Sequence, residues 1–366
     1  MEFDSIQKHR LLEDIRNDYF KYNRAIAYEY ITQGILTKED LIDRHHLLTL
    51  SAYYHIKKYP NLIDEQTVLP LCPLNIEEQM ISGDVDVLFW GVPGSGGKTS
   101  LLASLMTLIG KNNSFVYRHN STDKNIYGHY LSNYLSDNRL PPATNQCYIQ
   151  IVNTLHQSNG ISSGVSFIEF AGEQVVALAS NSIDDGLYGG SVTPDLIKIL
   201  SNTNKKILFV CYDPTNLKDF QIGSCESFQH IFQSDLLSCV VSLMHKNSQF
   251  MKNVIAIHLV ITKSDVWLNQ SLERSLTSII EEGGCGGLFL QIEKLAKDYG
   301  INKHINNKVE PIPFTIGKFM MGDTYEFDNS DAKKILKLIE EDIAAYNKNK
   351  SNLKKLGLKF NRFFNS

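Results

Sequence analysis

The sequence predicts a layered α/β fold, in which helices cover both faces of a mostly parallel sheet with one antiparallel edge strand, and an all-helical region precedes it. Two observations support this prediction. From residue 84 onward, short apolar runs alternate with longer stretches of helical periodicity, which is the pattern of a three-layer α/β domain. Before residue 60, apolar residues recur only at three- and four-residue spacing, which favours helices without strands.

The first 78 residues are expected to form this helical region and a linker. Apolar residues recur at helical spacing from 6 to 19, and residues 37–40 (Thr-Lys-Glu-Asp) resemble an N-cap before a second helical stretch, 41–56. Three prolines then disfavour helix between residues 60 and 78: Pro60, Pro70 and Pro73. The helical region and its linker are therefore assigned to residues 1–78.

The α/β domain is expected to span residues 79–346. Its strands are predicted at 85–90, 147–154, 164–170, 206–212, 254–261 and 311–315. Helices are predicted at 98–110, within 227–252 and 270–298, and at 331–346, with a variable insert at 111–143 and an irregular stretch before residue 206. Only a short polar connection separates the second and third strands, and short connections join antiparallel strands. This pair supplies the antiparallel edge.

A glycine-rich loop closed by Lys98 and Thr99 comes after the first strand. Glycines allow consecutive backbone N–H groups to surround phosphate oxygens, the lysine neutralises phosphate charge, and the threonine hydroxyl can bind Mg²⁺. The predicted phosphate-binding residues are Gly94, Ser95, Gly96, Gly97, Lys98, Thr99 and Ser100. Val92 stands where the first glycine of such loops usually lies, so a plain glycine-rich turn is the alternative, but the flanking strand and helix favour a nucleotide site.

The strand 254–261 is followed directly by Thr262, Lys263 and Asp265. A carboxylate here can accept two hydrogen bonds from guanine, from its ring N–H and its amine, whereas adenine offers no such pair of donors. The aliphatic stem of the lysine can lie across the base. An ordinary loop is the alternative, but the position after a buried strand favours guanine recognition by these three residues.

Residues 84–346 resemble the Ras-like, translation-factor-related class of P-loop GTPases, and three further motifs carry the resemblance. Thr144 ends a Pro-Pro-Ala-Thr string, where that class keeps a threonine that closes over Mg²⁺ and the γ-phosphate. Glu169-Phe170-Ala171-Gly172 stands where the class has Asp-x-x-Gly. Gly317 lies in a Thr-Ile-Gly-Lys string where the class keeps its last base-contacting loop, with an ordinary strand-to-loop turn as the alternative.

The resemblance implies a P-loop NTPase three-layer sandwich that binds GTP or GDP with Mg²⁺ and hydrolyses GTP as a slow regulatory switch. It implies metal contacts from Thr99, Thr144 and Glu169, and hydrolytic roles for Lys98, Thr144, Gly172 and Glu173. Two departures affect hydrolysis. Glu169 replaces an aspartate, and Glu173 stands where many members have a glutamine that positions water, a role that Gln174 could take instead.

A narrower resemblance joins the chain to the bacterial double-GTPase proteins, through its long insert, its helical leader and the Gly172-Glu173 pair. Two other functions remain open on the residues alone. One is an ATPase or nucleotide kinase that uses the same phosphate loop, with Asp213 as the acidic metal residue. The other is a scaffold that binds nucleotide with little hydrolysis.

Composition limits the partners. The formal net charge of −4 gives no global basic field, so nucleic acid is not supported. The six cysteines are scattered, the first residues lack an apolar signal core, and a cytoplasmic protein is expected. Residues 347–366 carry six basic and no acidic residues with apolar residues near helical spacing, which predicts a basic amphipathic tail. This tail could contact an anionic membrane surface or a partner protein, or dock on its own domain; a regulator protein is also expected.

Overall fold

The computed structural model describes residues 5–58, 84–93, 97–109, 111, 114–117, 126–136, 140–141, 149–158, 161–183, 192–215, 219–222, 229–265, 285–302 and 305–364 of the chain. The predicted linker between residues 60 and 78 lies outside them.

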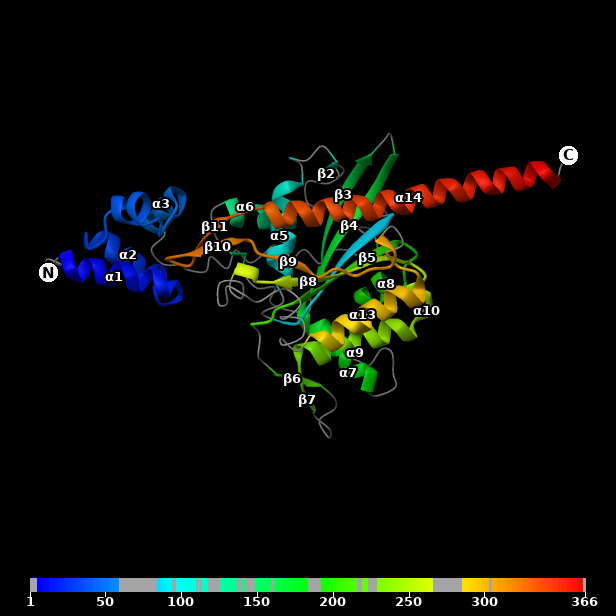
Figure 1. Ribbon diagram of the computed structural model, residues 1–366, viewed down its shortest axis with the longest axis horizontal. Coiled ribbons are helices and arrows are strands. Elements are labelled where there is room, and N and C mark those ends of the chain that lie inside the picture. Colours follow the sequence, from blue (N-terminus) through cyan, green and yellow to red (C-terminus); the bar gives the residue numbers. More distant parts are fainter. Residues whose placement is uncertain are drawn as a thin grey trace.

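A central sheet organises the larger domain (Figure 1). Within the described residues it has seven strands in the order β2-β3-β4-β1-β5-β8-β9. Their bounds are β1 Val85–Trp90, β2 Phe115–Tyr117, β3 Ile149–Ser158, β4 Ile161–Phe170, β5 Lys205–Tyr212, β8 Val254–Thr262 and β9 Ile312–Phe314. Strands β4, β1, β5, β8 and β9 are parallel to one another, and β3 is antiparallel to β4.

The predicted α/β fold with its antiparallel strand is therefore confirmed. One detail differs: β3 is second from the edge, because β2 pairs outside it in antiparallel fashion. Strand β2 lies in the segment 111–143 that the sequence marks only as a variable insert. Three residues are too few to show the alternation by which a strand is recognised in a sequence.

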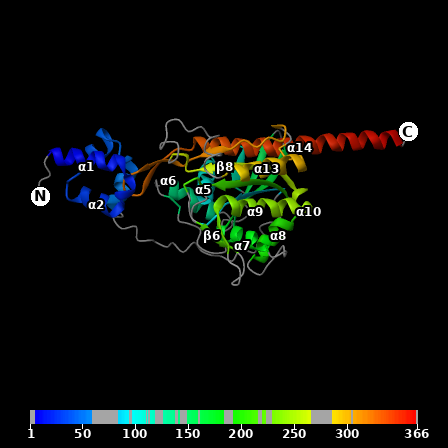
Figure 2. The same ribbon diagram turned by 60° about the horizontal axis from the view of Figure 1, so that its bottom comes forward.

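Helices cover both faces of the sheet. One layer holds α5 (Lys98–Leu108), α6 (Ile126–Ser136) and the first part of α14 (Ser330–Phe364), and its core includes Phe89. The other layer holds α7 (Gly172–Ile183), α8 (Pro194–Ser201), α9 (Gln233–Lys246), α10 (Ser248–Met251) and α13 (Gly286–Tyr299), and its core includes Trp90. Figures 1 and 2 show these two layers on opposite sides of the strands. Adjacent residues of a strand thus pack into opposite cores, because successive side chains of a pleated strand point to opposite faces of the sheet.

Two helices occupy a stretch that was expected to be irregular. In α7 the residues Val175, Ala177, Leu178 and Ala179 are all buried. A small hairpin of β6 (Asp219–Ile222) and β7 (Gln229–Phe232) also precedes α9, where helix was expected from residue 227.

The N-terminal residues form a small helical unit with its own core. It contains α1 (Ser5–Asn17), a 3₁₀ turn (Tyr19–Lys21), α2 (Arg24–Thr32), a π-helical turn (Glu39–Arg44) and α3 (Leu50–Lys58). The helix predicted at 41–56 is thus divided in two, and His46 in the break has a left-handed φ of 51°.

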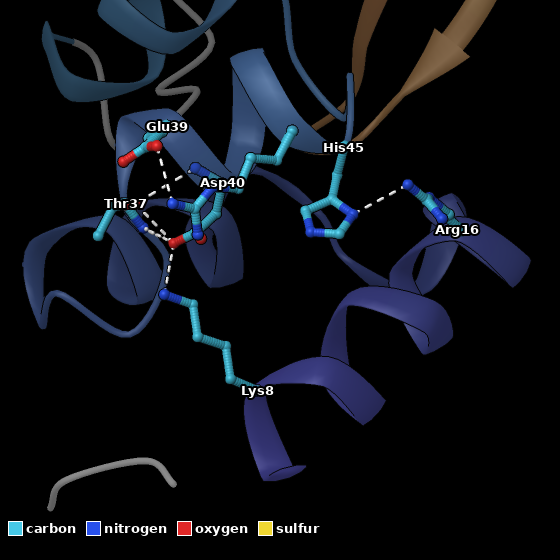
Figure 3. Close-up of polar contacts among 7 residues, drawn as sticks. Lys8, Arg16, Thr37, Glu39, Asp40 and His45 are labelled. Atoms are coloured by element: carbon cyan, nitrogen blue, oxygen red, sulfur yellow. Dashed lines mark hydrogen bonds and ion pairs between the residues drawn. The ribbon is translucent and has the colours of Figure 1, made fainter. Parts of the chain in front are cut away.

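A buried carboxylate organises the start of the π-helical turn (Figure 3). Asp40 Oδ2 accepts hydrogen bonds from the amide and hydroxyl of Thr37, at 2.8 and 2.6 Å, and the Asp40 amide donates back to the Thr37 hydroxyl. Lys8 Nζ, from α1, lies 2.5 Å from the same oxygen. This reciprocal pair is the N-cap that the sequence predicts at residues 37–40.

A hairpin joins the helical unit to the sheet domain. It is formed by β10 (Gly317–Met320) and β11 (Thr324–Phe327), and it projects from the end of β9 toward the helical unit (Figure 1). At its tip Met321 is fully buried in the core of the helical unit, and the Gly322 amide donates to the Tyr22 carbonyl at 2.8 Å. The sequence predicts neither strand.

The last helix continues past the sheet. The predicted helix 331–346 and the predicted tail form one helix, α14, so residue 346 is not a break in secondary structure. Figures 1 and 2 both show the later turns of α14 extending beyond the domain. Among the described residues, no helix combines the length and apolar character that crossing a membrane requires.

Candidate nucleotide-binding site

The predicted site residues gather at one edge of the sheet, where the parallel strands end. Strands β1, β4, β5, β8 and β9 deliver the glycine-rich loop, Gly172, Asp213, the Lys263 to Asp265 segment and Thr315 to this edge. Ligands of open α/β sheets bind outside the carboxyl ends of the strands. The fold therefore places the proposed phosphate and base loops on the same side. Gly94, Ser95, Gly96 and Thr144 lie outside the described residues.

Gly97, in the glycine-rich loop, lies against the end of β8, just before the Lys263 to Asp265 segment. It caps α5 with a φ of 63°, a left-handed conformation that favours glycine. A Cβ at this position would lie 2.8 Å from Thr262 Cγ2, so the backbone approaches the end of β8 closely. The Thr262 hydroxyl donates to the Tyr212 carbonyl at 3.1 Å, which ties the end of β8 to the end of β5.

Lys98 lies at the start of α5 with 5% of its surface exposed. Its Nζ donates to the carbonyl oxygens of Gly91 and Val92, at 2.9 and 3.0 Å, and burial lowers the pKa of the ammonium group. An ammonium group has three donors, so it can bind these carbonyls and still reach a phosphate.

The position of Gly91 explains the shifted glycine of the loop. A Cβ at residue 91 would lie 3.1 Å from Lys98 Cγ and 3.2 Å from the Cys211 carbonyl oxygen. The lysine stem and strand β5 therefore occupy the space beside residue 91. The chain has its first glycine here, one position before the usual one, where a larger side chain would crowd the Lys98 stem and the Cys211 carbonyl.

Glu169, at the end of β4, reaches the hydroxyl that was predicted to bind metal. Its carboxylate is almost fully buried, and Oε1 accepts a hydrogen bond from Thr99 Oγ1. Oε2 accepts from the hydroxyl of Tyr127, on α6, at 2.7 Å. The sequence predicts Thr99 and Glu169 as metal contacts, but it does not predict Tyr127, which lies in the insert and has no motif around it.

Gly172 begins α7 against the start of the phosphate loop. A Cβ there would lie 2.2 Å from Pro93 N and 2.4 Å from the Val92 carbonyl carbon, so any other residue would collide with the loop backbone. Glu173 is exposed in the first turn of α7. Gln174 is buried, and its Oε1 accepts from the Thr193 amide at 2.9 Å. This contact directs the Gln174 side chain to the start of α8, which disfavours the alternative that Gln174 positions water.

Asp213 and Lys263 form an ion pair across the ends of β5 and β8. Lys263 has a left-handed φ of 56°, and its Nζ lies 2.8 Å from Asp213 Oδ2. Asp213 Oδ1 accepts from the amide of Thr215 at 2.9 Å and so caps the turn that follows β5. The ion pair was not predicted, although both residues come directly after the ends of neighbouring parallel strands.

Asp265 faces the loop after β9. Its Oδ1 accepts from the Thr315 hydroxyl at 2.9 Å, and the Gly317 amide donates to the same hydroxyl oxygen at 3.1 Å. Gly317 has a φ of 132°, and a Cβ there would lie 2.0 Å from the Glu326 carbonyl oxygen. The side chain that reaches Asp265 is therefore that of Thr315, while Gly317 starts the β10–β11 hairpin.

No protein-family model and no curated protein sequence matches this chain. Solved structures align with it at low similarity, and two of them are as follows. Methanosarcina barkeri Roco2 RocCORdC bound to GDP is 14% identical, with 70% of this chain and 49% of that chain covered and a TM-score of 0.30. The GTPase-like domain of S. cerevisiae Ski7, bound to GTP, is 13% identical, with 74% and 53% covered and a TM-score of 0.35. The chain thus spans about half the length of each, and likenesses of this size do not identify a family.

Proposed function

We propose that this chain binds GTP and GDP together with Mg²⁺ and hydrolyses GTP slowly to GDP and phosphate, as a regulatory switch of the P-loop GTPase class. The observation that carries the proposal is the close approach of Gly97 to Thr262. It brings the loop built for phosphates against the loop that carries Asp265. The base of a triphosphate bound at the first loop would therefore lie near the second loop. The resemblance to the bacterial double-GTPase branch stays a prediction.

Mg²⁺ suits the pair formed by Thr99 and Glu169. Magnesium prefers hard oxygen ligands and is usually held by one or two protein oxygens together with waters and phosphates. The Thr99 hydroxyl already donates to the Glu169 carboxylate, and the negative charge of Glu169 opposes the lowering of the Lys98 pKa by burial. We propose Thr144 as the third protein contact. When bound, the ion would neutralise charge that develops on the phosphate oxygens.

Hydrolysis requires charge neutralisation and an oriented water. Lys98 would neutralise charge between the β- and γ-phosphates, and the Gly172 amide would donate to a γ-phosphate oxygen. Glu173, exposed at the start of α7, would accept a proton from the attacking water and orient it. A carboxylate in place of an amide is the reason that we expect slow turnover. Loss of the γ-phosphate would release Thr144 and the start of α7, which gives a partner protein two states to distinguish.

The contacts of Asp213 disfavour the ATPase or nucleotide kinase alternative. That function would require Asp213 to act as the acidic metal residue. In the structure the Asp213 carboxylate binds the Thr215 turn and Lys263, while the Thr99 hydroxyl is bound by Glu169. We therefore propose that a metal beside Thr99 would be held from β4 and not from β5.

A side-by-side titration tests the proposal. Fluorescent analogues of GTP and ATP are added to the purified chain with Mg²⁺ or with EDTA, and phosphate release from both nucleotides is measured. We expect GTP to bind at least about 100-fold more tightly than ATP, because unpaired polar groups penalise the wrong base. Binding should weaken in EDTA, and slow phosphate release should depend on Mg²⁺. Comparable affinities for the two nucleotides would refute guanine recognition, and absence of phosphate release would leave a binding scaffold.

The basic tail is proposed to contact an anionic membrane surface. The later turns of α14 extend beyond the domain in both views (Figures 1 and 2), which disfavours docking of the tail on its own sheet. The full-length double variant Lys354→Glu with Lys355→Glu should bind phosphatidylserine vesicles at least about tenfold more weakly, since each basic residue contributes about 1 kcal/mol. The matched control reverses Lys333 and Lys337, exposed on the same helix. Equal sedimentation of wild type and the tail variant would reject the membrane contact.

A further inference from the structure

The carboxylate of Glu169 is held from both sides. Thr99, on α5, donates to Oε1, and Tyr127, on α6, donates to Oε2 at 2.7 Å. The glutamate is 1% exposed and the tyrosine 7% exposed, so solvent water has little access to this arrangement. Strand β4 fixes the glutamate backbone, with Phe89 of β1 and Gln150 of β3 as its neighbours in register.

Helix α6 holds the tyrosine firmly. A Cβ at Gly128, the next residue, would lie 3.1 Å from Val152 Cγ1, 3.2 Å from Tyr117 Cε1 and 3.3 Å from Met106 Sδ. The helix therefore approaches β3, β2 and α5 closely at this turn. Leu131, one turn later, is also buried in the same core. The orientation of the Tyr127 hydroxyl is thus set by packing and not by the carboxylate alone.

A glutamate at the end of β4 has one more rotatable bond than an aspartate and can place its carboxylate in more positions. A second donor, fixed on the opposite side, removes this freedom and determines which oxygen faces the hydroxyl of Thr99. The phenolic hydroxyl of a tyrosine is protonated at neutral pH and can donate to the carboxylate. Partners that hydrogen-bond to ligating carboxylates typically change metal affinity 10- to 100-fold when they are removed.

We propose that Tyr127 is a positioning residue for magnesium: it holds Oε2 of Glu169 so that Oε1 is directed to the metal position beside Thr99. The inference rests on the proposed function, because it concerns the same site. It assigns to the insert at 111–143 a specific part in that site, namely to deliver α6 and its tyrosine to the metal carboxylate. The tyrosine thus compensates for the longer side chain of the glutamate, since a shorter aspartate at this position would need no second donor.

The test is the free Mg²⁺ concentration at which the chain retains a fluorescent GDP analogue, measured from the rate of its dissociation. Tyr127→Phe should raise this concentration about tenfold and leave the GDP affinity in EDTA unchanged, since one hydroxyl to the metal carboxylate is lost. Tyr130→Phe is the matched control, because it removes a hydroxyl from the same helix that contacts Tyr134 instead. Its magnesium requirement should equal that of the wild type.

A double variant separates positioning from packing. In Glu169→Asp the shorter carboxylate cannot span both donors, so adding Tyr127→Phe should raise the magnesium requirement less than about twofold further. An unchanged requirement in Tyr127→Phe would overturn the inference, as would a GDP affinity that falls equally in EDTA or a full tenfold effect in the aspartate background. Failure of the proposed function would appear differently, as a wild-type chain whose GDP retention does not depend on Mg²⁺, and this result would overturn the inference as well.

Discussion

Replacing Asp265 with asparagine is expected to lower the affinity for GDP roughly 100- to 10,000-fold and to raise the affinity for the xanthine nucleotide. The carboxylate would accept from two guanine donors, and hydrogen bonds to charged groups contribute about 1.5–3 kcal/mol each. An asparagine amide would place a donor against the guanine amine, whereas the oxo group of xanthine can accept from it. Buried donors left without a partner account for discrimination of this size.

The asparagine variant is a clean test because it preserves the local structure. Thr315 donates to Oδ1 of Asp265, and an asparagine keeps an acceptor at that atom. The matched control is Asp195→Asn, in the first turn of α8, which removes a carboxylate charge from an exposed pair with Lys198. Competition between GDP and xanthosine diphosphate (XDP) measures the preference for guanine over xanthine in both variants. A preference for guanine that survives in Asp265→Asn would show that another group selects the base.

Lys98→Met is expected to weaken GDP and GTP binding at least about 100-fold without changing the choice of base. Methionine retains the aliphatic stem that lies beside Gly91 but removes the charge and its donors. Loss of one charge-assisted hydrogen bond to a phosphate oxygen corresponds to about 1.5–3 kcal/mol, and loss of the ammonium charge beside the phosphates weakens binding further. The fluorescent GDP titration measures the loss, and thermal unfolding without nucleotide shows whether the loop remains folded.

Lys111→Met is the control for charge alone, since Lys111 is exposed just beyond the end of α5. The two proposed subsites then give distinct signatures. Lys98→Met should lower the affinities for GDP and XDP by the same factor, while Asp265→Asn should invert their ratio. Near-normal GDP affinity in Lys98→Met would refute the proposed role of this lysine.

Local patterns predict the parts of the site that lie within one short segment. The glycine-rich loop and the segment from Thr262 to Asp265 each come directly after an apolar strand, and Glu169 lies near the end of another. Parallel strands bring the loops at their carboxyl ends to a common edge of the sheet. The sequence therefore predicts which segments meet. It also marks the departures, such as the early glycine, and the structure gives Gly91 a reason through its contact with the Lys98 stem.

Partners supplied by distant segments leave no such pattern. Tyr127 reaches Glu169 from a helix inside an insert, and Thr315 reaches Asp265 across 50 positions of the chain. The role of a tyrosine or threonine hydroxyl depends on the groups that surround it in the folded protein.

A structure of the chain with Mg²⁺ and GDP would decide whether Asp265 selects the base. We expect the Asp265 carboxylate within hydrogen-bonding distance of the guanine ring N–H and amine, the Lys263 stem along the face of the base, and Lys98 at the phosphates. A base held by other groups, with the Asp265 carboxylate turned only toward Thr315, would contradict guanine recognition by this residue.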